Sequence, residues 1–513
     1  MSVISDTVAS LKALARPNNK YRAIPAPVTG RNHAQQVFDE RPPRSRLFKL
    51  SMSVMLLAVL VFLGFAFARD RSASKSCVNN GSCTHDFRKH WGQYSPYFSA
   101  HKGSIKPDIP SGCDVTFASI LSRHGSRNPT AGKSKAYKDL IERIQKDVKD
   151  YGKGFEFLKD YKYTLGSDDL TPFGEQEMVK SGKKFFKRYQ KLAEDSTHPF
   201  VRASGSERVV MSAQNFVHGF YKAKAKNGSK YLEDILVIPE GNGSNNTLDH
   251  GTCGAFENGP NAELARDKQA PWKNVWATPI MERLNAKLPG AKITLEETVY
   301  FMDLCPFNTV ASEKSTVSDF CRLFSKEEWH GYEYYESLEK WYGYGPANPL
   351  GPTQGVGYVN ELIARLSHSP VQDRTSTNET LDSNPSTFPL NRLLYADFSH
   401  DNTMMTVYAA LGIYTNATEI PTDHRVSSKK ADGYSASQAV PFGARMYVEK
   451  MHCGQDDYEM VRVLVNDRVI PPKGCKADKL GRCEVGDFLK GLDFAKKGGL
   501  WDQCRTEGEH TRG

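Results

Sequence analysis

Two short stretches of the sequence hold residue types that could transfer a phosphoryl group. In the first, residues 123–129 (RHGSRNP), His124 lies between Arg123 and Arg127 beside a glycine. Each guanidinium group is planar and can bind two phosphate oxygens while neutralising their charge. A neutral imidazole between them could attack phosphorus and become a phosphohistidine. A bare Arg-His-Gly is more often a basic surface loop, but the longer string is far more restrictive.

The second stretch, residues 399–402, reads Ser-His-Asp-Asn. His400 could donate a hydrogen bond to a bound phosphate, and Asp401, if held protonated, could protonate the departing alkoxide. A helix that begins at Asp401 would also direct the positive end of its dipole at the anion. Alone, Asp401 could equally be a helix N-cap, so this stretch gains its meaning from the first one.

Buried strands are expected to position both stretches. Residues 115–121 (VTFASIL) and 393–398 (LLYADF) are near-continuous apolar runs, typical of strands buried on both faces, and each run leads directly into one stretch. Ligands of open α/β sheets bind at the carboxyl ends of such strands. The sequence therefore predicts an α/β fold with a site at this edge of its sheet.

Helices are predicted between and after these strands. Apolar residues at helical spacing mark one face in residues 137–148 and another in residues 209–220. Thr-Pro at residues 171–172 has the N-cap and first-turn types of a further helix. A last helix is expected over residues 401–411, ended by Gly412.

The remaining pattern suggests a second, smaller unit. Residues 445–449 and 461–469 alternate like strands of a sheet. The middle of the chain, roughly residues 133–300, is rich in helices and loops, which favours an inserted helical subdomain.

Charge is unevenly distributed along the 513 residues. The chain has 68 Lys and Arg against 59 Asp and Glu, a formal net charge of +9, yet residues 1–49 alone hold nine basic and three acidic residues. The rest of the chain is nearly balanced and has no basic block paired with aromatic residues, which argues against nucleic-acid binding. A mean hydropathy of −0.54 excludes a polytopic membrane protein.

An uncharged apolar run follows this basic tail. Residues 50–68 are long enough to cross about 30 Å of hydrocarbon at about 1.5 Å per helical residue. The basic residues before the run predict a cytosolic N-terminus and a luminal or extracellular catalytic domain. The alternative is secretion after cleavage near Ala68, since residues 66–68 have the A-x-A form of a cleavage site. The expected organisation is a disordered basic cytosolic tail at 1–49, a transmembrane signal-anchor at 50–68, a short stem at 69–76 and a folded domain at 77–513.

Cysteine usage is typical of an exported protein. All ten cysteines follow the apolar run, and no pair has the C-x-x-C spacing of a zinc site, so we expect disulfides and no bound metal. The same part of the chain holds six N-x-S/T sequons, which agrees with a glycoprotein. These sequons begin at Asn80, Asn227, Asn242, Asn245, Asn378 and Asn416.

The chain from Cys77 to Cys504 resembles the histidine acid phosphatases, and most closely the fungal phytases, also called 3-phytases. The matching strings are WGQY from Trp91, RHGSRNPT from Arg123, LTPFGEQE from Leu170, VRASGSERV from Val201, NNTLDHGTC from Asn245, MDLCPF from Met302, NPLGPTQGVGYVNELIARL from Asn348 and FSHDNTM from Phe398. The resemblance implies an α/β sheet domain with a smaller inserted α-helical domain. It also implies hydrolysis of phosphate monoesters at acidic pH through a phosphohistidine, with phytate (myo-inositol hexakisphosphate) as substrate.

The resemblance further implies roles for single residues. His124 would be the nucleophile and Asp401 the proton donor, with no cofactor. The transferred phosphate would be bound by Arg123, Arg127, Arg202 and His400. The rest of the inositol phosphate would be bound by Gln93, Tyr94, Thr130 and Lys340. Without the resemblance, Arg202 could be an ordinary ion-paired residue and Lys340 part of a solvated face.

The cysteine pairing also comes from the resemblance, because the sequence alone leaves every pairing open. The disulfides implied are Cys77–Cys83, Cys113–Cys453, Cys253–Cys504, Cys305–Cys321 and Cys475–Cys483.

One departure from the family pattern bears on the substrate. Where many fungal phytases have two lysines followed by YYGHGAGNP, this chain has Glu339 and Lys340 followed by WYGYGPANP. A carboxylate in place of an ammonium weakens the attraction for a highly anionic substrate. The first alternative is therefore a broad-specificity acid phosphatase with little phytate preference. A separate alternative, from another functional class, is an inactive membrane-tethered binding protein of the same fold.

Overall fold

The computed structural model describes residues 86–101, 105–195, 198–225, 234–241, 243–416, 419–454 and 458–505. The predicted tail, signal-anchor and stem, at 1–49, 50–68 and 69–76, lie outside these residues. Within the described ranges, every helix is too short or too polar to cross a membrane.

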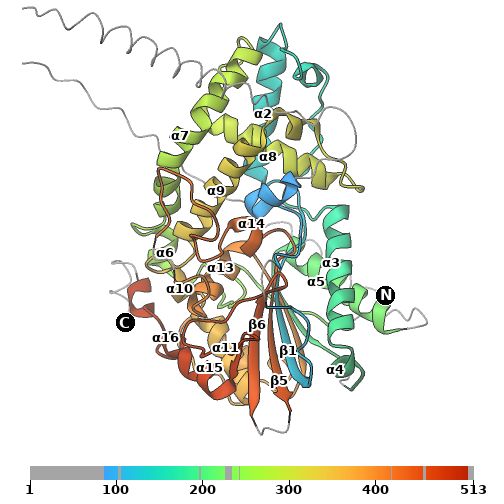
Figure 1. Ribbon diagram of the computed structural model, residues 1–513, viewed down its shortest axis with the longest axis vertical. Coiled ribbons are helices and arrows are strands. Elements are labelled where there is room, and N and C mark those ends of the chain that lie inside the picture. The colour runs from blue at the N-terminus through green and yellow to red at the C-terminus, as the bar shows by residue number, and fades with distance from the viewer. Residues whose placement is uncertain are drawn as a thin grey trace, which may run out of the picture. The chain divides into compact units, whose positions relative to one another are not determined.

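A mixed sheet of eight strands forms the centre of the described chain (Figure 1). Its order is β3-β2-β4-β1-β5-β6-β7, and β8 pairs with β6. The strands are β1 (Cys113–Arg123), β2 (Phe200–Ser204), β3 (Leu236–Ile238), β4 (Leu394–Ser399), β5 (Arg445–Cys453), β6 (Glu459–Val465), β7 (Arg468–Val469) and β8 (Arg482–Glu484). The first four strands are mutually parallel, and the later ones pair in antiparallel fashion.

Helices surround this sheet. The α-helices are α2 (Ala131–Asp147), α3 (Pro172–Arg188), α4 (Gln190–Asp195), α5 (Glu207–Lys224), α6 (Gly254–Asn258), α7 (Leu264–Lys287), α8 (Leu295–Ala311), α9 (Lys326–Gly343), α10 (Gly351–Gln354), α11 (Val356–Ser367), α12 (Glu379–Asp382), α13 (Asp401–Ala410), α14 (Ala436–Ala439), α15 (Val485–Gly491) and α16 (Asp493–Lys496). Short 3-10 helices are η2 (Phe87–His90), η3 (Gly92–Tyr94), η4 (Glu156–Lys159), η5 (Asp319–Leu323) and η6 (Trp501–Cys504).

The two predicted buried strands are confirmed as β1 and β4, and they are neighbours. They pair in parallel, with Arg123 opposite Ser399 at their carboxyl ends. Parallel strands that are in register end at the same edge of a sheet. This pairing therefore brings residues 123–129 and 399–402 together.

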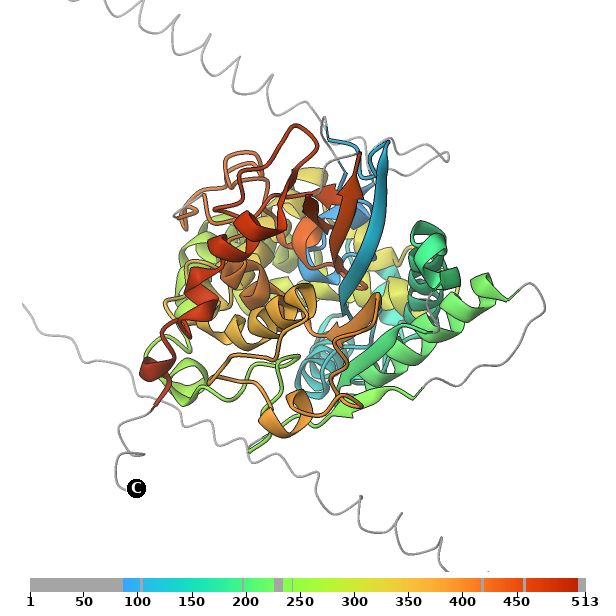
Figure 2. The same cartoon turned by 90° about the horizontal axis from the view of Figure 1, so that it is seen from below.

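The apolar run of β1 is continuous because the strand is covered on both faces. Ala118 and Ile120 pack in one cluster with Phe185 of α3 and Phe216 of α5. Phe117 and Leu121, on the other face, belong to a separate and larger core. The green helices α3 and α5 accordingly lie on one side of the sheet, and the orange and red helices α11, α13 and α15 on the other (Figure 2).

A second group of helices, α2, α7, α8 and α9, lies beyond the end of the sheet (Figure 1). In it, α7 packs against α8 and α9, and α2 packs against α8. The α/β fold with a sheet and a helical domain is thus confirmed. The helical group does not coincide with residues 133–300. Helices α3 and α5 lie within that range but cover the sheet, whereas α9 belongs to the helical group and follows the range.

Local signals in the sequence are largely confirmed. Thr171 caps α3, with its hydroxyl accepting a hydrogen bond from the Gly174 amide at 3.1 Å. Helix α13 ends at Ala410, and Gly412 follows with a φ of +73°. The prediction of one strand over residues 461–469 is wrong. Asn466 and Asp467 adopt φ of +49° and +68° and form a two-residue hairpin turn between β6 and β7.

Four of the five implied disulfides are present. They join Cys113–Cys453, Cys253–Cys504, Cys305–Cys321 and Cys475–Cys483. The fifth, Cys77–Cys83, falls outside the described residues.

Candidate active site

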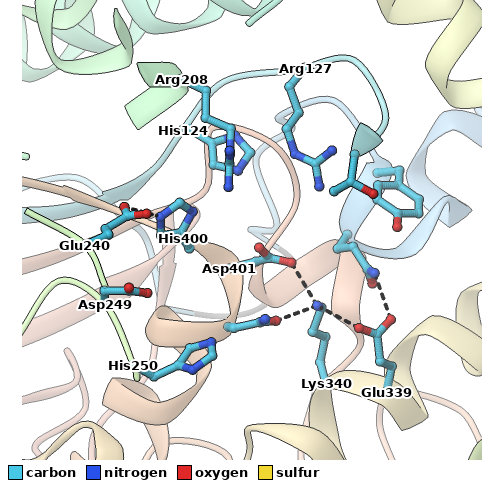
Figure 3. A pocket seen from close by; sticks show the side chains of 14 residues that line it. His124, Arg127, Arg208, Glu240, Asp249, His250, Glu339, Lys340, His400 and Asp401 are labelled. Carbon is cyan, nitrogen blue, oxygen red and sulfur yellow. Dashed lines mark hydrogen bonds and ion pairs between the residues drawn. The ribbon is translucent and has the colours of Figure 1, made fainter. Parts of the chain in front are cut away.

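A pocket of about 300 Å³ opens at the carboxyl edge of the parallel strands (Figure 3). Its lining is strongly polar and holds basic, acidic and imidazole side chains. The lining residues are Gln93, Tyr94, His124, Arg127, Thr130, Arg208, Glu240, Asp249, His250, Glu339, Lys340, His400, Asp401 and Asn402. Eight of the ten predicted site residues therefore meet in one pocket, and the exceptions are Arg123 and Arg202.

His124, directly after β1, is held as a neutral imidazole. Its Nδ1 lies 2.8 Å from the carbonyl oxygen of Gly125, which can only accept, so Nδ1 carries the proton and Nε2 keeps its lone pair. Burial lowers the pKa of His124 well below its ordinary value, and the nearby guanidinium groups of Arg123, Arg208 and Arg127 lower it further. Nε2 is thus available as a nucleophile even in acid.

The loop that carries His124 rests on the first turn of α3. A Cβ on Gly125 would lie 2.5 Å from the Gly174 carbonyl oxygen, and one on Gly174 would lie 2.0 Å from that of Ser126, so this approach requires both glycines. Glu177 accepts hydrogen bonds from the amide and the hydroxyl of Ser126, at 2.9 and 2.6 Å. Residues 170–177 (LTPFGEQE) therefore position the loop of residues 123–130 (RHGSRNPT).

Arg127 and Arg208 form the cationic side of the pocket. Both lie at the same end of it as His124 in Figure 3, with Arg208 coming from the first turn of α5. The buried Nε atoms of both have no hydrogen-bond partner in the described part of the chain. Burial and the neighbouring charge of Arg127 lower the pKa of Arg208. Arg208 has a long contact, 4.0 Å, with the exposed carboxylate of Asp168. Two guanidinium groups beside a nucleophile form a binding site for an anion.

His400 is oriented by a carboxylate. Its Nε2 lies 2.8 Å from Oε1 of Glu240, which also accepts hydrogen bonds from Ser204 and Ser206. Burial alone would raise the pKa of Glu240, but these hydrogen bonds and the charge of His400 hold it well below its ordinary value. The rings of His400 and His124 are 5.7 Å apart, so both imidazoles face the same part of the pocket.

Asp401, the first residue of α13, is surrounded by cations. Its Oδ2 lies 2.9 Å from Nζ of Lys340, and its Oδ1 lies 3.5 Å from Nη2 of Arg123. Burial alone would raise the pKa of Asp401, but Arg123 and Lys340 hold it well below the ordinary value. Lys340 in turn contacts Oε1 of Glu339 at 3.1 Å and Oδ1 of Asn402 at 2.7 Å.

Arg123 lies beneath the pocket rather than in its wall. Its side chain is fully buried, and Nη1 donates to the carbonyl oxygens of Gln93 and Val440. Its Nη2 makes no hydrogen bond to the described residues. Arg123 therefore supplies positive charge next to Asp401 and ties η3, which carries Gln93 and Tyr94, to the end of β1.

Arg202, predicted to bind phosphate, is not brought to the pocket. It lies inside β2, 2% exposed, with Nε 2.8 Å from Oδ1 of Asp397 and Nη2 2.6 Å from Oε2 of Glu361. Arg365 pairs with the other oxygen of Asp397 at 2.6 Å. The reason is positional, because a side chain in the middle of a strand faces a neighbouring layer, whereas the site collects residues that follow the strand ends. Arg208, six residues later in the same string, lines the pocket instead.

Several lining residues were not predicted as site residues. Arg208, Asp249 and His250 stand in the strings VRASGSERV and NNTLDHGTC, so position within those strings was the available signal. Glu240 follows β3, and the short apolar run at residues 235–238 (ILVI) that ends just before it was the available signal. Within the described residues, no group of three or more His, Cys, Asp or Glu side chains is arranged to hold a metal ion.

Comparison with known proteins decides the family. The family model of the histidine phosphatase superfamily (branch 2) matches residues 114–466. The chain belongs to this superfamily. Among its relatives, this histidine phosphatase is 53% identical to phytase A of Emericella nidulans over 422 residues, which cover 81% of this chain and 90% of that one. It is 50% identical to phytase A of Aspergillus oryzae over 443 residues, which cover 85% and 94%.

Solved structures share the fold of this histidine phosphatase. The phytase from D. castellii matches with a TM-score of 0.66 and 23% identity, covering 84% of this chain and 91% of that one. The multiple inositol polyphosphate phosphatase of Bifidobacterium longum, solved with inositol hexasulfate, matches with a TM-score of 0.55 and 14% identity, covering 79% and 97%.

Proposed function

We propose that this histidine phosphatase hydrolyses phosphate monoesters, with phytate as its substrate, through a phosphohistidine on His124. The observation that carries the proposal is the neutral His124, with Nε2 free, in one pocket with Arg127, Arg208 and Asp401. The choice of phytate is supported by the phytase A relatives, which are 53% and 50% identical over most of the chain.

In the first step, Nε2 of His124 attacks phosphorus and the bond from phosphorus to the ester oxygen breaks. Asp401 gives its proton to the departing oxygen, so that the alcohol leaves neutral. Arg127 and Arg208 bind the equatorial oxygens, and Arg123 and His400 add positive charge around them. These groups are already in position, so they stabilise the charge that develops in the transition state without further rearrangement.

In the second step, water attacks the phosphohistidine. Asp401, now ionised, takes a proton from that water, the bond between phosphorus and Nε2 breaks, and inorganic phosphate leaves. His124 regains its free Nε2 and Asp401 its proton. Neither step needs a metal ion, because the arginine side chains carry the charge neutralisation.

Asp401 must gain its proton when the substrate is bound. In the free pocket Lys340 and Arg123 hold it ionised. A bound phosphate dianion attracts both cations and repels the carboxylate, which raises the pKa of Asp401. The required form is the protonated one, so the rate increases as pH falls, and we expect an acidic optimum.

Acid also suits the rest of the pocket. Its lining includes four carboxyl side chains, those of Glu240, Asp249, Glu339 and Asp401. Glu339 neutralises part of the charge of Lys340, with which it is in contact. Burial raises the pKa of Asp249, so protonation of this carboxylate as the pH falls removes a negative charge from the lining and favours a substrate that carries many phosphates.

The proposal is tested with the purified full chain on phytate and on 4-nitrophenyl phosphate from pH 3 to pH 8, with and without EDTA. We expect a higher kcat/KM on phytate, an optimum below pH 7 and no effect of EDTA. A kcat/KM that is no higher on phytate than on 4-nitrophenyl phosphate would instead identify a broad-specificity acid phosphatase. Absence of turnover on both substrates would identify a binding protein.

We also propose that residues 50–68 anchor the protein, with residues 1–49 in the cytosol, 69–76 as a stem and 77–513 as the luminal or extracellular domain. Four disulfides support an oxidising compartment for that domain. Extraction of membranes at high pH tests it, because an anchored chain stays with the lipid. Release of a chain that begins after Ala68 would support secretion by cleavage instead.

A further inference from the structure

His250 is a rigidly held imidazole on the side of the pocket away from Arg127 and Arg208 (Figure 3). Its Nδ1 lies 2.7 Å from Oε1 of Glu257, which belongs to α6. Its ring packs against Phe256 and Tyr344, with ring centroids at 5.7 and 5.2 Å. With Nδ1 held by Glu257 and both neighbouring rings fixing the plane, Nε2 is the atom left for a ligand.

The mechanism proposed above makes no use of this side chain. His124, Arg127, Arg208 and His400 lie around the transferred phosphate, but phytate carries five more phosphates that also need counter-charges. Lys340 is the lysine of the pocket lining, yet two carboxylates, those of Asp401 and Glu339, already lie 2.9 and 3.1 Å from its Nζ. A second phosphate therefore finds little free charge at Lys340 alone.

His250 and Lys340 are neighbours across one ring. The Nζ of Lys340 lies 5.3 Å from the ring centroid of Tyr344, which also packs on His250. Both side chains line the pocket, with Asn402 as a further polar group of the lining. An anion between them would meet an ammonium group and an imidazole at once.

The charge of His250 is set by the groups that face it. Glu257 of α6, Asp249 next in the chain and Asp401 of α13 are the carboxyl groups. Burial alone would lower the pKa of His250, but these carboxylates raise it above the ordinary value. Burial also raises the pKa of Asp249. In acid, therefore, this side of the pocket becomes more positive, because His250 gains a charge and Asp249 loses one.

We propose that cationic His250, together with Lys340, binds a second phosphate of the substrate and makes the preference for polyphosphorylated substrates depend on pH. The inference rests on the proposed function and adds a specificity-determining residue to it. His250 does not touch the transferred phosphate, so its effect is larger for phytate than for a compact monophosphate.

The test compares the ratio of kcat/KM on phytate to kcat/KM on 4-nitrophenyl phosphate at pH 4 to 8. His250→Asn lowers this ratio about tenfold at pH 5, and its effect becomes smaller as the pH rises and the parent loses the imidazolium charge. His250→Lys keeps the ratio near that of the parent at pH 5, and its ratio falls less than that of the parent as the pH rises. His424→Asn, an exposed histidine paired with Asp423, is the matched control and leaves the ratio as in the parent.

Equal ratios for His250→Asn and the parent at pH 5 would overturn the inference, as would a failure of His250→Lys to restore the ratio. If His250→Asn does not fold, Glu257→Gln replaces it, since loss of that carboxylate shifts the pH dependence of the ratio to lower pH. A pH dependence of the ratio that is the same in Glu257→Gln as in the parent would then overturn the inference.

A binding measurement separates this inference from the proposed function. In the His124→Ala background, the affinity for inositol hexasulfate at pH 5 falls about tenfold on adding His250→Asn. Unchanged affinity overturns the second phosphate site even if turnover is normal. Lost affinity supports it even if the parent shows no turnover, which would contradict the proposed function alone.

Discussion

The ammonium nitrogen of Lys340 lies 2.9 Å from Oδ2 of Asp401, so the proposed proton donor is held as an anion in the free pocket. Lys340 is only 3% exposed, which makes this contact stronger than a surface ion pair. The acid form of Asp401 must therefore arise as substrate binds and competes for the lysine. The same contact links substrate binding to the pH dependence of the reaction.

Lys340→Gln is expected to shift the basic limb of the kcat profile to higher pH. Without the ammonium group the pKa of Asp401 rises, and because the protonated acid is the active form, activity then persists to higher pH. The substrate should be glycerol 2-phosphate, whose alkoxide leaving group needs the proton. Lys138→Gln, an exposed pair with Glu142, serves as control. A limb that moves to lower pH would contradict this role of Lys340.

Arg208→Ala is expected to lower kcat/KM about 10²- to 10³-fold, because one preorganised donor to the transferred phosphate is lost. The thermal unfolding midpoint should change little, since the Nε of Arg208 has no partner among the described residues. Steady-state kinetics and a thermal melt on the same sample check both parts. An unchanged kcat/KM would remove Arg208 from the phosphate site.

Arg202→Met is expected to lower the stability of the protein rather than its activity, the opposite of Arg208→Ala. It leaves the buried carboxylates of Asp397 and Glu361 short of a partner, which costs about 3–5 kcal/mol of unfolding free energy. Activity per folded molecule should stay within a few-fold of the parent. Arg88→Met, at an exposed ion pair, is the control for the melt. A stable but inactive Arg202→Met protein would instead mean that Arg202 binds the transferred phosphate.

Glu240→Gln is expected to lower kcat about tenfold or more, because His400 loses the carboxylate that orients it. The fold should persist, since an amide oxygen in the place of Oε1 still accepts from the Ser204 hydroxyl and the Ser206 amide, and the NH2 group can donate to the Ser206 hydroxyl. Kinetics at saturating phytate would check this. A parent-like kcat would mean that His400 needs no carboxylate partner.

The sequence was most informative where a buried strand leads straight into a motif. The apolar runs before His124 and His400 predicted β1 and β4, and strand pairing then explains why the two motifs meet. The same rule extends to Arg208 and Glu240, which follow β2 and β3, so at least one site residue follows the carboxyl end of each of the four parallel strands.

What the sequence could not supply was the partner of each charge. Arg202 and Arg208 stand in one string, and only the three-dimensional structure shows which carboxylates each one meets. Arg202 pairs with the buried Asp397 and Glu361, whereas Arg208 lines the pocket and has a 4.0 Å contact with the exposed Asp168. Likewise, the contact of Lys340 with Asp401 joins residues 61 positions apart in sequence. Such long-range pairs depend on how helices pack on the sheet, which local patterns do not specify.

The central claim is that His124 carries the phosphoryl group. Rapid acid-free quenching during turnover of ³²P-labelled phytate, followed by peptide mapping, tests it most directly. We predict a base-stable, acid-labile phosphate on His124 that disappears in His124→Ala, together with loss of turnover. A folded His124→Ala protein that hydrolyses phytate near the parent rate, or label on another residue, would contradict it.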